Sequence, residues 1–267
     1  MKPAPFAYRP AGSLAAARQA LAAGTGKLSA GNQSLGPMLN LRLARPVELI
    51  DIAGLPELRT VTDMGAAVRL GAAITHAEIE DGAVADPTPG WLAAAAGAIA
   101  HRAVRNRGTL GGSLAHADPA ADWVIVMTGL GASLVLAGPD GERTVPADAF
   151  LTGAFETVLE HGEVILAVEV QKPGAGARWG YYKYCRQVGE FAKASATVLA
   201  DPVTGRHRAA LGALGGPPVL LRDAEGLIAG RVDPAEAVRT ALADTAVDPA
   251  LSIVALRRAL QAAAATA

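Results

Sequence analysis

The chain has 267 residues and a formal net charge of −1; 51% of its residues are hydrophobic and only 18% are charged. No apolar run approaches the roughly 18 residues that a membrane span needs, and scattered Lys and Arg give no reason to expect nucleic-acid binding. The length is enough for a substantial hydrophobic core. Because the first ten residues carry no apolar signal-peptide segment, we expect a cytoplasmic protein.

The first 170 residues predict a mixture of helices and strands. Ser13 is typical of a helix N-cap, so a helix is expected from Leu14 to about Leu21. Pro37 is suited to open a short helix. The other elements expected here are strands over 27–29 and 47–52, a hairpin of 58–61 with 67–70, helices over 89–103 and 120–129, and strands over 132–137 and 163–170.

A stretch of small residues, 172–177, predicts a boundary between two domains. Beyond it, strands over 180–184, 195–200 and 208–214 precede helices over 223–229, 234–243 and 248–264. This order predicts an α+β protein with one domain over 1–173 and a smaller α+β domain over 174–267.

Cysteine and histidine usage limits the possible metal and redox chemistry. Cys185 is the only cysteine, which excludes an internal disulfide and an iron–sulfur cluster held by this chain. The five histidines are far apart, and none stands at a ligand spacing from another His or Cys. We therefore expect no metal site, and any redox chemistry needs an organic cofactor.

Two segments, 29–35 and 109–113, combine glycine with hydroxyl and amide side chains, and a helix is expected after each. Such loops turn successive backbone N–H groups toward phosphate oxygens. Either segment alone is more often a structural turn, but the two together predict the halves of a diphosphate-binding cradle. Neither fits the dinucleotide fingerprint of the doubly wound fold or the lysine-containing phosphate loop, so a different fold is expected.

Four motifs together resemble one known family. Residues 30–43 (AGNQSLGPMLNLRL) and 109–122 are similar to the first and second FAD loops of the flavoprotein subunit of molybdenum hydroxylases, the family of xanthine dehydrogenase and aerobic carbon monoxide dehydrogenase. Residues 163–166 and 183–193 complete the set in the same order, and the resemblance covers nearly the whole chain. It implies a vanillyl-alcohol-oxidase (PCMH)-type FAD-binding domain, followed by a small C-terminal domain of the carbon monoxide dehydrogenase flavoprotein type.

The resemblance also implies how the two loops bind FAD. Their backbone N–H groups, with the hydroxyls of Ser34, Thr109 and Ser113, would line the diphosphate. Asn32 departs from the glycine usual at its place, but asparagine tolerates the left-handed backbone conformation. The diphosphate positions implied are Ser29, Ala30, Gly31, Asn32, Gln33, Ser34, Leu35, Thr109, Leu110, Gly111, Gly112 and Ser113.

The remaining implied FAD contacts each have a structural alternative. Asp118 and Asp122 would lie by the ribityl and adenosine parts of FAD. The structural alternative for Asp118 is a helix N-cap before Pro119, and the alternative for Asp122 is an interaction with the helix dipole. Ile165 or Leu166 would supply apolar contact. Lys183 would stabilise the anionic reduced flavin, and Phe191 would pack against the isoalloxazine. The alternatives for these last two are a surface lysine and plain core packing.

The function implied is electron transfer, with no catalytic residue of this chain. FAD would take electrons from [2Fe–2S] clusters on a small partner subunit and pass them to NAD⁺, dioxygen or a quinone, while a large subunit holds molybdopterin. The assembly implied is a dimer of heterotrimers. Two alternatives are a self-contained vanillyl-alcohol-oxidase-type enzyme, for which a second domain of about 90 residues is small, and a partner-binding module that has lost its cofactor.

Overall fold

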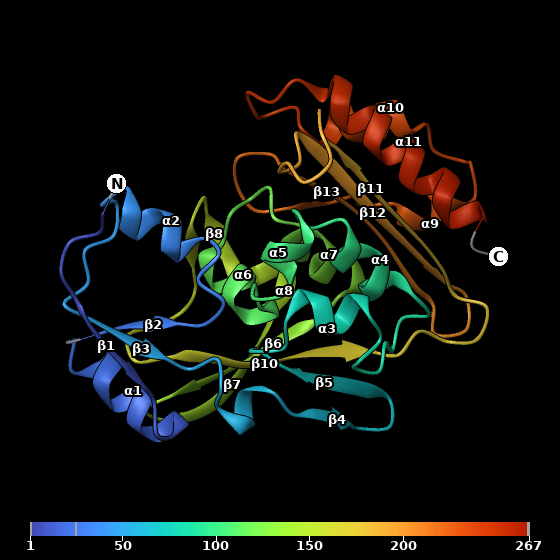
Figure 1. The fold of residues 1–267 in the computed structure, drawn as a ribbon. Coiled ribbons are helices and arrows are strands. Elements are labelled where there is room, and N and C mark those ends of the chain that lie inside the picture. The colour runs from blue at the N-terminus through green and yellow to red at the C-terminus, as the bar shows by residue number, and fades with distance from the viewer. Residues whose placement is uncertain (1, 25, 266–267) are drawn as a thin grey trace.

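The computed structural model describes residues 2–24 and 26–265, arranged around three main β-sheets (Figure 1). The first sheet is parallel, in the order β1 (Ala7–Pro10), β3 (Glu48–Asp51), β2 (Lys27–Ser29). Parallel strands need crossover connections, and α1 (Leu14–Ala22) and α2 (Leu35–Asn40) provide them. The predicted N-cap is confirmed, because the Ser13 hydroxyl accepts a hydrogen bond from the backbone N–H of Ala16.

The second sheet is antiparallel and is covered by a group of helices, one of which contains residues 110–113 of the second glycine segment. Its order is β4 (Val61–Asp63), β5 (Ala67–Gly71), β10 (Val164–Gln171), β6 (Ser133–Gly138) and β7 (Gly141–Pro146). The helices are α3 (His76–Glu80), α4 (Trp91–Gly97), α5 (Arg102–Arg105), α6 (Leu110–His116) and α7 (Asp122–Leu130). Short elements complete this part: η1 (Pro56–Leu58), α8 (Ala147–Phe150) and the hairpin of β8 (Leu151–Gly153) with β9 (Glu156–Thr157).

The third sheet lies between α7 and the C-terminal helices (Figure 1). Its antiparallel order is β11 (Arg178–Tyr184), β12 (Ala194–Asp201), β13 (Arg206–Gly212) and β14 (Val219–Leu220), and its helices are α9 (Ala224–Ile228), α10 (Pro234–Ala241) and α11 (Pro249–Ala265). Every residue of β12 is buried, because Val198 belongs to the core under α11 while Leu199 belongs to the core around α7. Gly180 lets α11 approach β11 closely, since a Cβ there would overlap the carbonyl of Ala259.

The chain passes from β10 to β11 through a segment that side chains of the third sheet hold in place. Asp201 accepts a hydrogen bond from the N–H of Gly174 at 2.9 Å, and Arg206 donates to the carbonyl of Lys172 at 3.0 Å. The Arg206 guanidinium also pairs with Asp201 at 3.2 Å. This segment is therefore tied to the β12–β13 turn.

The α+β class is confirmed, and most elements form where the sequence predicts them. The helix expected over 89–103 is wrong: it divides into α4 and α5, because Ala100 adopts a positive φ of 41° between them. The helix expected from residue 120 begins at Asp122 with Ala121 as N-cap. Asp118 is not that cap, since its carboxylate accepts from the N–H of Ala120 in a turn before the helix.

Candidate functional site

The first glycine loop joins β2 to α2 and presents a row of free backbone donors. Asn32 has the left-handed conformation expected of it, with φ of 60°. Its side-chain amide turns inward and donates to Ser29 Oγ at 2.8 Å and to the carbonyl of Ala30 at 3.2 Å. Among the hydrogen bonds between described residues, none uses the backbone N–H of residues 31 to 35 as donor. A loop of this kind is suited to bind an anionic group.

The two glycine segments lie against each other. An added Cβ at Gly31 would overlap the carbonyl oxygen of Arg107 and stand 2.7 Å from the Cα of Gly108. Gly31 therefore allows the first loop to contact the backbone that leads into the second. This contact brings the two halves of the predicted cradle together.

The second segment uses its backbone donors within the protein. Thr109 caps α6, because its hydroxyl accepts from the N–H of Gly112 at 3.1 Å. The N–H groups of Leu110 and Gly111 donate to the carbonyls of Ile74 and Ala72, and Ser113 donates to Thr109 within the helix start. Each of these N–H groups therefore has an acceptor within the protein. Contact of residues 110 to 113 with a diphosphate stays a prediction. The side chain of Leu110 is fully buried in the core.

Gly111 is required because the start of α6 packs closely against Ala72. A Cβ there would overlap that of Ala72 and lie 2.9 Å from its carbonyl oxygen. Ala72 in turn donates its N–H to the carbonyl of Leu166 at 3.0 Å, which connects α6 to β10. The Ile165 side chain is buried in the core, whereas Leu166 lines an outer groove of about 310 Å³ with Leu14. Their contact with FAD stays a prediction.

Lys183 and Asp122 form a buried ion pair between β11 and the start of α7. The Lys183 ammonium donates to Asp122 Oδ2 at 3.0 Å and to the carbonyl of Ala98 at 3.1 Å. The Lys183 and Asp122 side chains are 7% and 4% exposed, so the alternative of an ordinary surface lysine is wrong. The hydroxyl of Tyr181 donates to the other carboxylate oxygen of Asp122.

Burial shifts the titration of this group. It raises the pKa of the Asp122 carboxyl above its ordinary value, and the neighbouring Lys183 cation and Tyr181 hydroxyl oppose that rise. Burial and the Asp122 carboxylate also raise the pKa of Tyr181 well above its ordinary value. The phenol therefore keeps its proton and serves as a hydrogen-bond donor.

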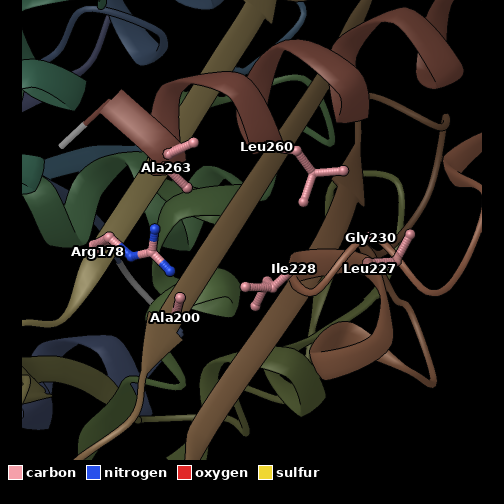
Figure 2. A pocket seen from close by; sticks show the side chains of 8 residues that line it. Arg178, Ala200, Leu227, Ile228, Gly230, Leu260 and Ala263 are labelled. Carbon is pink, nitrogen blue, oxygen red and sulfur yellow. The ribbon is translucent and has the colours of Figure 1, made fainter. Parts of the chain in front are cut away.

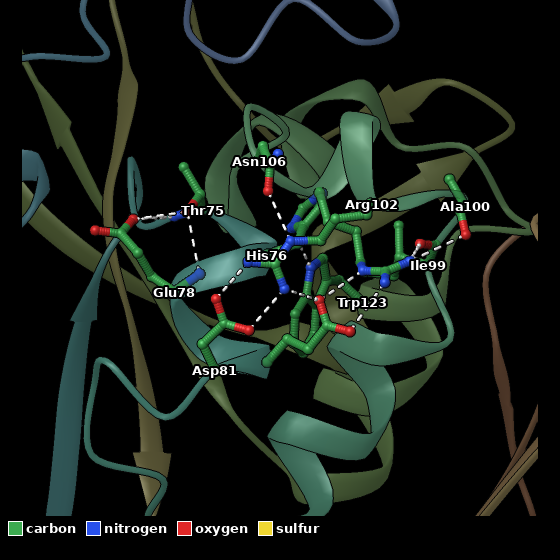
Figure 3. Close-up of polar contacts among 11 residues, drawn as sticks. Thr75, His76, Glu78, Asp81, Ile99, Ala100, Arg102, Asn106 and Trp123 are labelled. Atoms are coloured by element: carbon green, nitrogen blue, oxygen red, sulfur yellow. Dashed lines mark hydrogen bonds and ion pairs between the residues drawn. The ribbon is translucent and has the colours of Figure 1, made fainter.

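The segment that supplies the Ala98 carbonyl is held by arginine (Figure 3). The guanidinium of Arg105 donates to the carbonyls of Ile99 and Ala100 at 2.9 and 3.1 Å, and it pairs with both oxygens of Glu80. Arg102 pairs with Asp81 nearby. These bonds fix residues 99 and 100, and with them the position of the lysine's second acceptor.

A buried histidine lies under the second segment, and the sequence did not single it out as a site residue. His76 donates its backbone N–H to the carbonyl of Gly108, and its ring Nδ1 accepts from the indole N–H of Trp123 at 3.0 Å (Figure 3). Burial lowers the pKa of His76 to about 4, so the ring is neutral at pH 7. The sequence did not indicate that His76 is a buried acceptor, because its partner Trp123 lies 47 positions away in the chain.

Phe191 lies in the turn between β11 and β12 and is 58% exposed. The alternative of plain core packing is therefore wrong for it. Its neighbour Gly189 lies close to the ring of His101, since a Cβ there would stand 2.6 Å from that ring. Stacking of Phe191 on a flavin stays a prediction, as does the role of Asp118.

A second cavity lies within the C-terminal part of the chain (Figure 2). It has a volume of about 110 Å³, between β11, β12, α9 and α11, and its lining includes Arg178, Ala200, Leu227 and Leu260. No residue predicted to bind FAD lines it. Within residues 2–24 and 26–265, no group of three or more His, Cys, Asp or Glu is placed to hold a metal ion, and no helix has the length and apolar character of a membrane span.

Known proteins share both the sequence and the fold. A family model described as the FAD binding domain in molybdopterin dehydrogenase matches residues 4–173. The chain is 41% identical over 173 residues to the carbon monoxide dehydrogenase medium chain of Hydrogenophaga pseudoflava, covering 65% of this chain and 60% of that one. It is 38% identical over 208 residues to the nicotine 6-hydroxylase medium subunit of Paenarthrobacter nicotinovorans, covering 76% and 72%.

Solved structures extend the similarity to the whole chain. A carbon monoxide dehydrogenase from Hydrogenophaga pseudoflava that lacks the Mo-pyranopterin moiety of its molybdenum cofactor matches with a TM-score of 0.89 at 35% identity, covering 100% of this chain and 99% of that one. Quinoline 2-oxidoreductase from Pseudomonas putida 86 matches with a TM-score of 0.87 at 33% identity, also covering 100% and 99%.

The fold and the family model thus define a flavin-binding subunit of the α+β class. The chain belongs to the family of FAD-binding medium subunits of molybdopterin hydroxylases, which includes the carbon monoxide dehydrogenase and xanthine dehydrogenase medium chains. The resemblance carried by the four sequence motifs is confirmed. The curated carbon monoxide dehydrogenase medium chain aligns with this chain over about three fifths of its length.

Proposed function

We propose that this chain carries FAD as the electron-transfer subunit of a molybdenum hydroxylase. Bound FAD would supply the electron-accepting chemistry, receiving electrons from [2Fe–2S] clusters of a small partner subunit and yielding them to an external acceptor. The observation that supports this most strongly is the contact between the two glycine segments, with the free N–H groups of residues 31 to 35 beside it. Family membership supports the same cofactor.

The residues of the first loop fit a diphosphate better than those of the second. The N–H groups of residues 31 to 35 and the hydroxyl of Ser34, which makes no capping bond to α2, would bind the phosphate oxygens. Thr109 would act by holding the start of α6, and Ser113 would present its hydroxyl from that helix. Lys183 would place a cation near the isoalloxazine, as the resemblance implies.

The partner subunits complete the proposal. With one cysteine, this chain does not supply the thiolates of an iron–sulfur cluster. We assign the clusters to a small partner and molybdopterin to a large one, in a cytoplasmic dimer of heterotrimers. The medium chains and medium subunits to which this chain is similar support a multi-subunit enzyme. We also propose the division into domains at residue 173, where the family model ends.

A self-contained flavin oxidase fits less well. Such an enzyme covers an organic substrate with its second domain, and ligand sites usually measure about 300–1,000 Å³. The cavity within the C-terminal sheet and helices measures about 110 Å³ and is lined by none of the predicted FAD residues. A module that has lost its cofactor fits poorly with the free donors of the first loop.

The experiment is purification of the chain alone and together with its native partners. The proposal expects a yellow protein with a flavin spectrum, and co-purification with a cysteine-rich small chain and a large chain. A colourless, folded protein that does not take up added FAD would refute it. A yellow protein that oxidises an organic substrate without partners would favour the oxidase.

A further inference from the structure

In the buried cluster of Lys183, Asp122 and Tyr181, both carboxylate oxygens of Asp122 accept hydrogen bonds from the protein itself. One carboxylate oxygen accepts from the Lys183 ammonium and the other from the Tyr181 hydroxyl. With only 4% of its side chain exposed, Asp122 has little surface for a ligand. The sequence expectation placed this residue beside the ribityl or adenosine part of FAD, and the observed contacts suggest a second role through Lys183.

The strand explains why these groups meet. On β11 the residues Trp179, Tyr181 and Lys183 alternate onto the face that packs against the first part of the chain. There Trp179 stacks on Trp91 with ring centroids 5.6 Å apart. Tyr181 and Lys183 reach the first residue of α7 on the same face. The ion pair therefore lies at the interface, here called the seam, between the third sheet and the helices that cover the second sheet.

A buried ion pair has a different electrostatic effect from a lone lysine. At a separation of 3.0 Å in a protein interior, the Asp122 carboxylate offsets much of the field that the ammonium exerts on its surroundings. A hydrogen bond from Tyr181 draws part of the carboxylate charge toward itself, which weakens that offset. The Ala98 carbonyl accepts a second hydrogen bond from the ammonium, and Arg105 binds the carbonyls of the next two residues, Ile99 and Ala100.

We propose that Asp122 is a positioning residue that acts through Lys183: it holds the ammonium at the seam, offsets part of its charge, and with Tyr181 sets the positive potential that Lys183 exerts on the flavin. The inference rests on the proposed function, because it requires FAD to be bound near Lys183. It differs from direct binding of FAD by Asp122. Removing the Asp122 charge should raise the flavin potential if Asp122 acts through Lys183, and should lower FAD affinity if Asp122 binds FAD directly.

The test is a set of single and paired variants, measured by redox titration of the bound flavin. Asp122→Asn leaves the ammonium without its counter-ion, so the flavin midpoint potential is expected to rise. Lys183→Met is expected to lower it. The paired variant Asp122→Asn with Lys183→Met is expected to return close to the original potential. The FAD affinity of Asp122→Asn should change little.

Two further variants keep the test independent of folding defects. Tyr181→Phe keeps both charges but strengthens the offset, so it is expected to lower the potential with unchanged FAD affinity. Asp63→Asn is the matched control, since it breaks the surface pair of Asp63 with Lys172 and should leave the potential unchanged. Circular dichroism of each variant checks the fold.

Several outcomes would overturn the inference. A loss of FAD affinity in Asp122→Asn with no rise in potential indicates that Asp122 binds FAD directly. If the potential of the paired variant stays far from the original value, Asp122 does not act through Lys183. An unchanged potential in Tyr181→Phe would contradict the inference as well. If the unaltered chain takes up no FAD, the proposed function itself fails, and that result is distinct from the others.

Discussion

The backbone of Arg107 occupies the space in which Gly31 would carry a side chain. This contact joins a loop between parallel strands to the segment before α6. A diphosphate cradle assembled from two distant loops depends on such an approach, and only glycine permits it here.

The first prediction concerns Gly31. Gly31→Ala places a methyl group into the Arg107 carbonyl, which must push the two segments apart at a cost of about 1–3 kcal/mol. We expect flavin occupancy of the purified variant to fall sharply, measured from the ratio of flavin to protein absorbance. Gly36→Ala is the control, because nothing lies within 4 Å of its added Cβ. Equal occupancy in the two variants would contradict the prediction.

Gly111 tests a different effect. Because its missing Cβ would overlap Ala72, Gly111→Val is expected to destabilise the fold by about 1–3 kcal/mol, and flavin loss should follow from that damage. Urea unfolding of the apoprotein measures it, with the exposed Gly12→Ala as control. Full stability with lost flavin would instead support direct contact of Gly111 with a diphosphate, the position that the family resemblance implies.

His76 predicts a component of acid sensitivity. Its folded pKa of about 4 lies below the ordinary 6.5, so between these values the unfolded chain binds a proton that the folded chain does not. This group's contribution to stability is complete above pH 6.5 and is lost as the pH falls toward 4, by ~3 kcal/mol. Unfolding free energies between pH 4.5 and 7 measure it.

His76→Asn provides the comparison for that pH series. The amide oxygen of Asn can accept from the Trp123 indole in place of Nδ1. Asparagine does not titrate, so the variant's stability should depend less on pH in this window. Parallel curves for the two proteins would show that His76 is not the group responsible.

The Lys183 and Asp122 pair predicts strong coupling in the apoprotein. Removing one partner leaves a buried charge without compensation, so Lys183→Met is expected to cost about 3–5 kcal/mol of unfolding free energy. Adding Asp122→Asn should recover most of that loss, because no buried charge then remains. A double-mutant cycle by urea denaturation measures the coupling. Additive single effects would mean that the pair is not formed.

The sequence predicted features whose causes lie within a few residues. Ser13 caps α1 through a neighbour three positions away, and Asn32 takes the left-handed conformation that its side chain tolerates. The helix expected over 89–103 failed for the opposite reason. The break at Ala100 is stabilised by Arg105, which donates to the Ala100 carbonyl and pairs with Glu80. The periodicity of apolar residues along the helix does not indicate these contacts.

By itself, then, the sequence determined the α+β class and the family, and it predicted two segments suited to a diphosphate. These follow from local propensity and from motif order, which the chain carries in its linear form. The tertiary structure alone decided that Gly31 meets Arg107, that Gly111 packs on Ala72, and that Asp122 is paired with Lys183. Such contacts join residues far apart in the chain, and they exist only because strand register and helix packing bring those residues to one place.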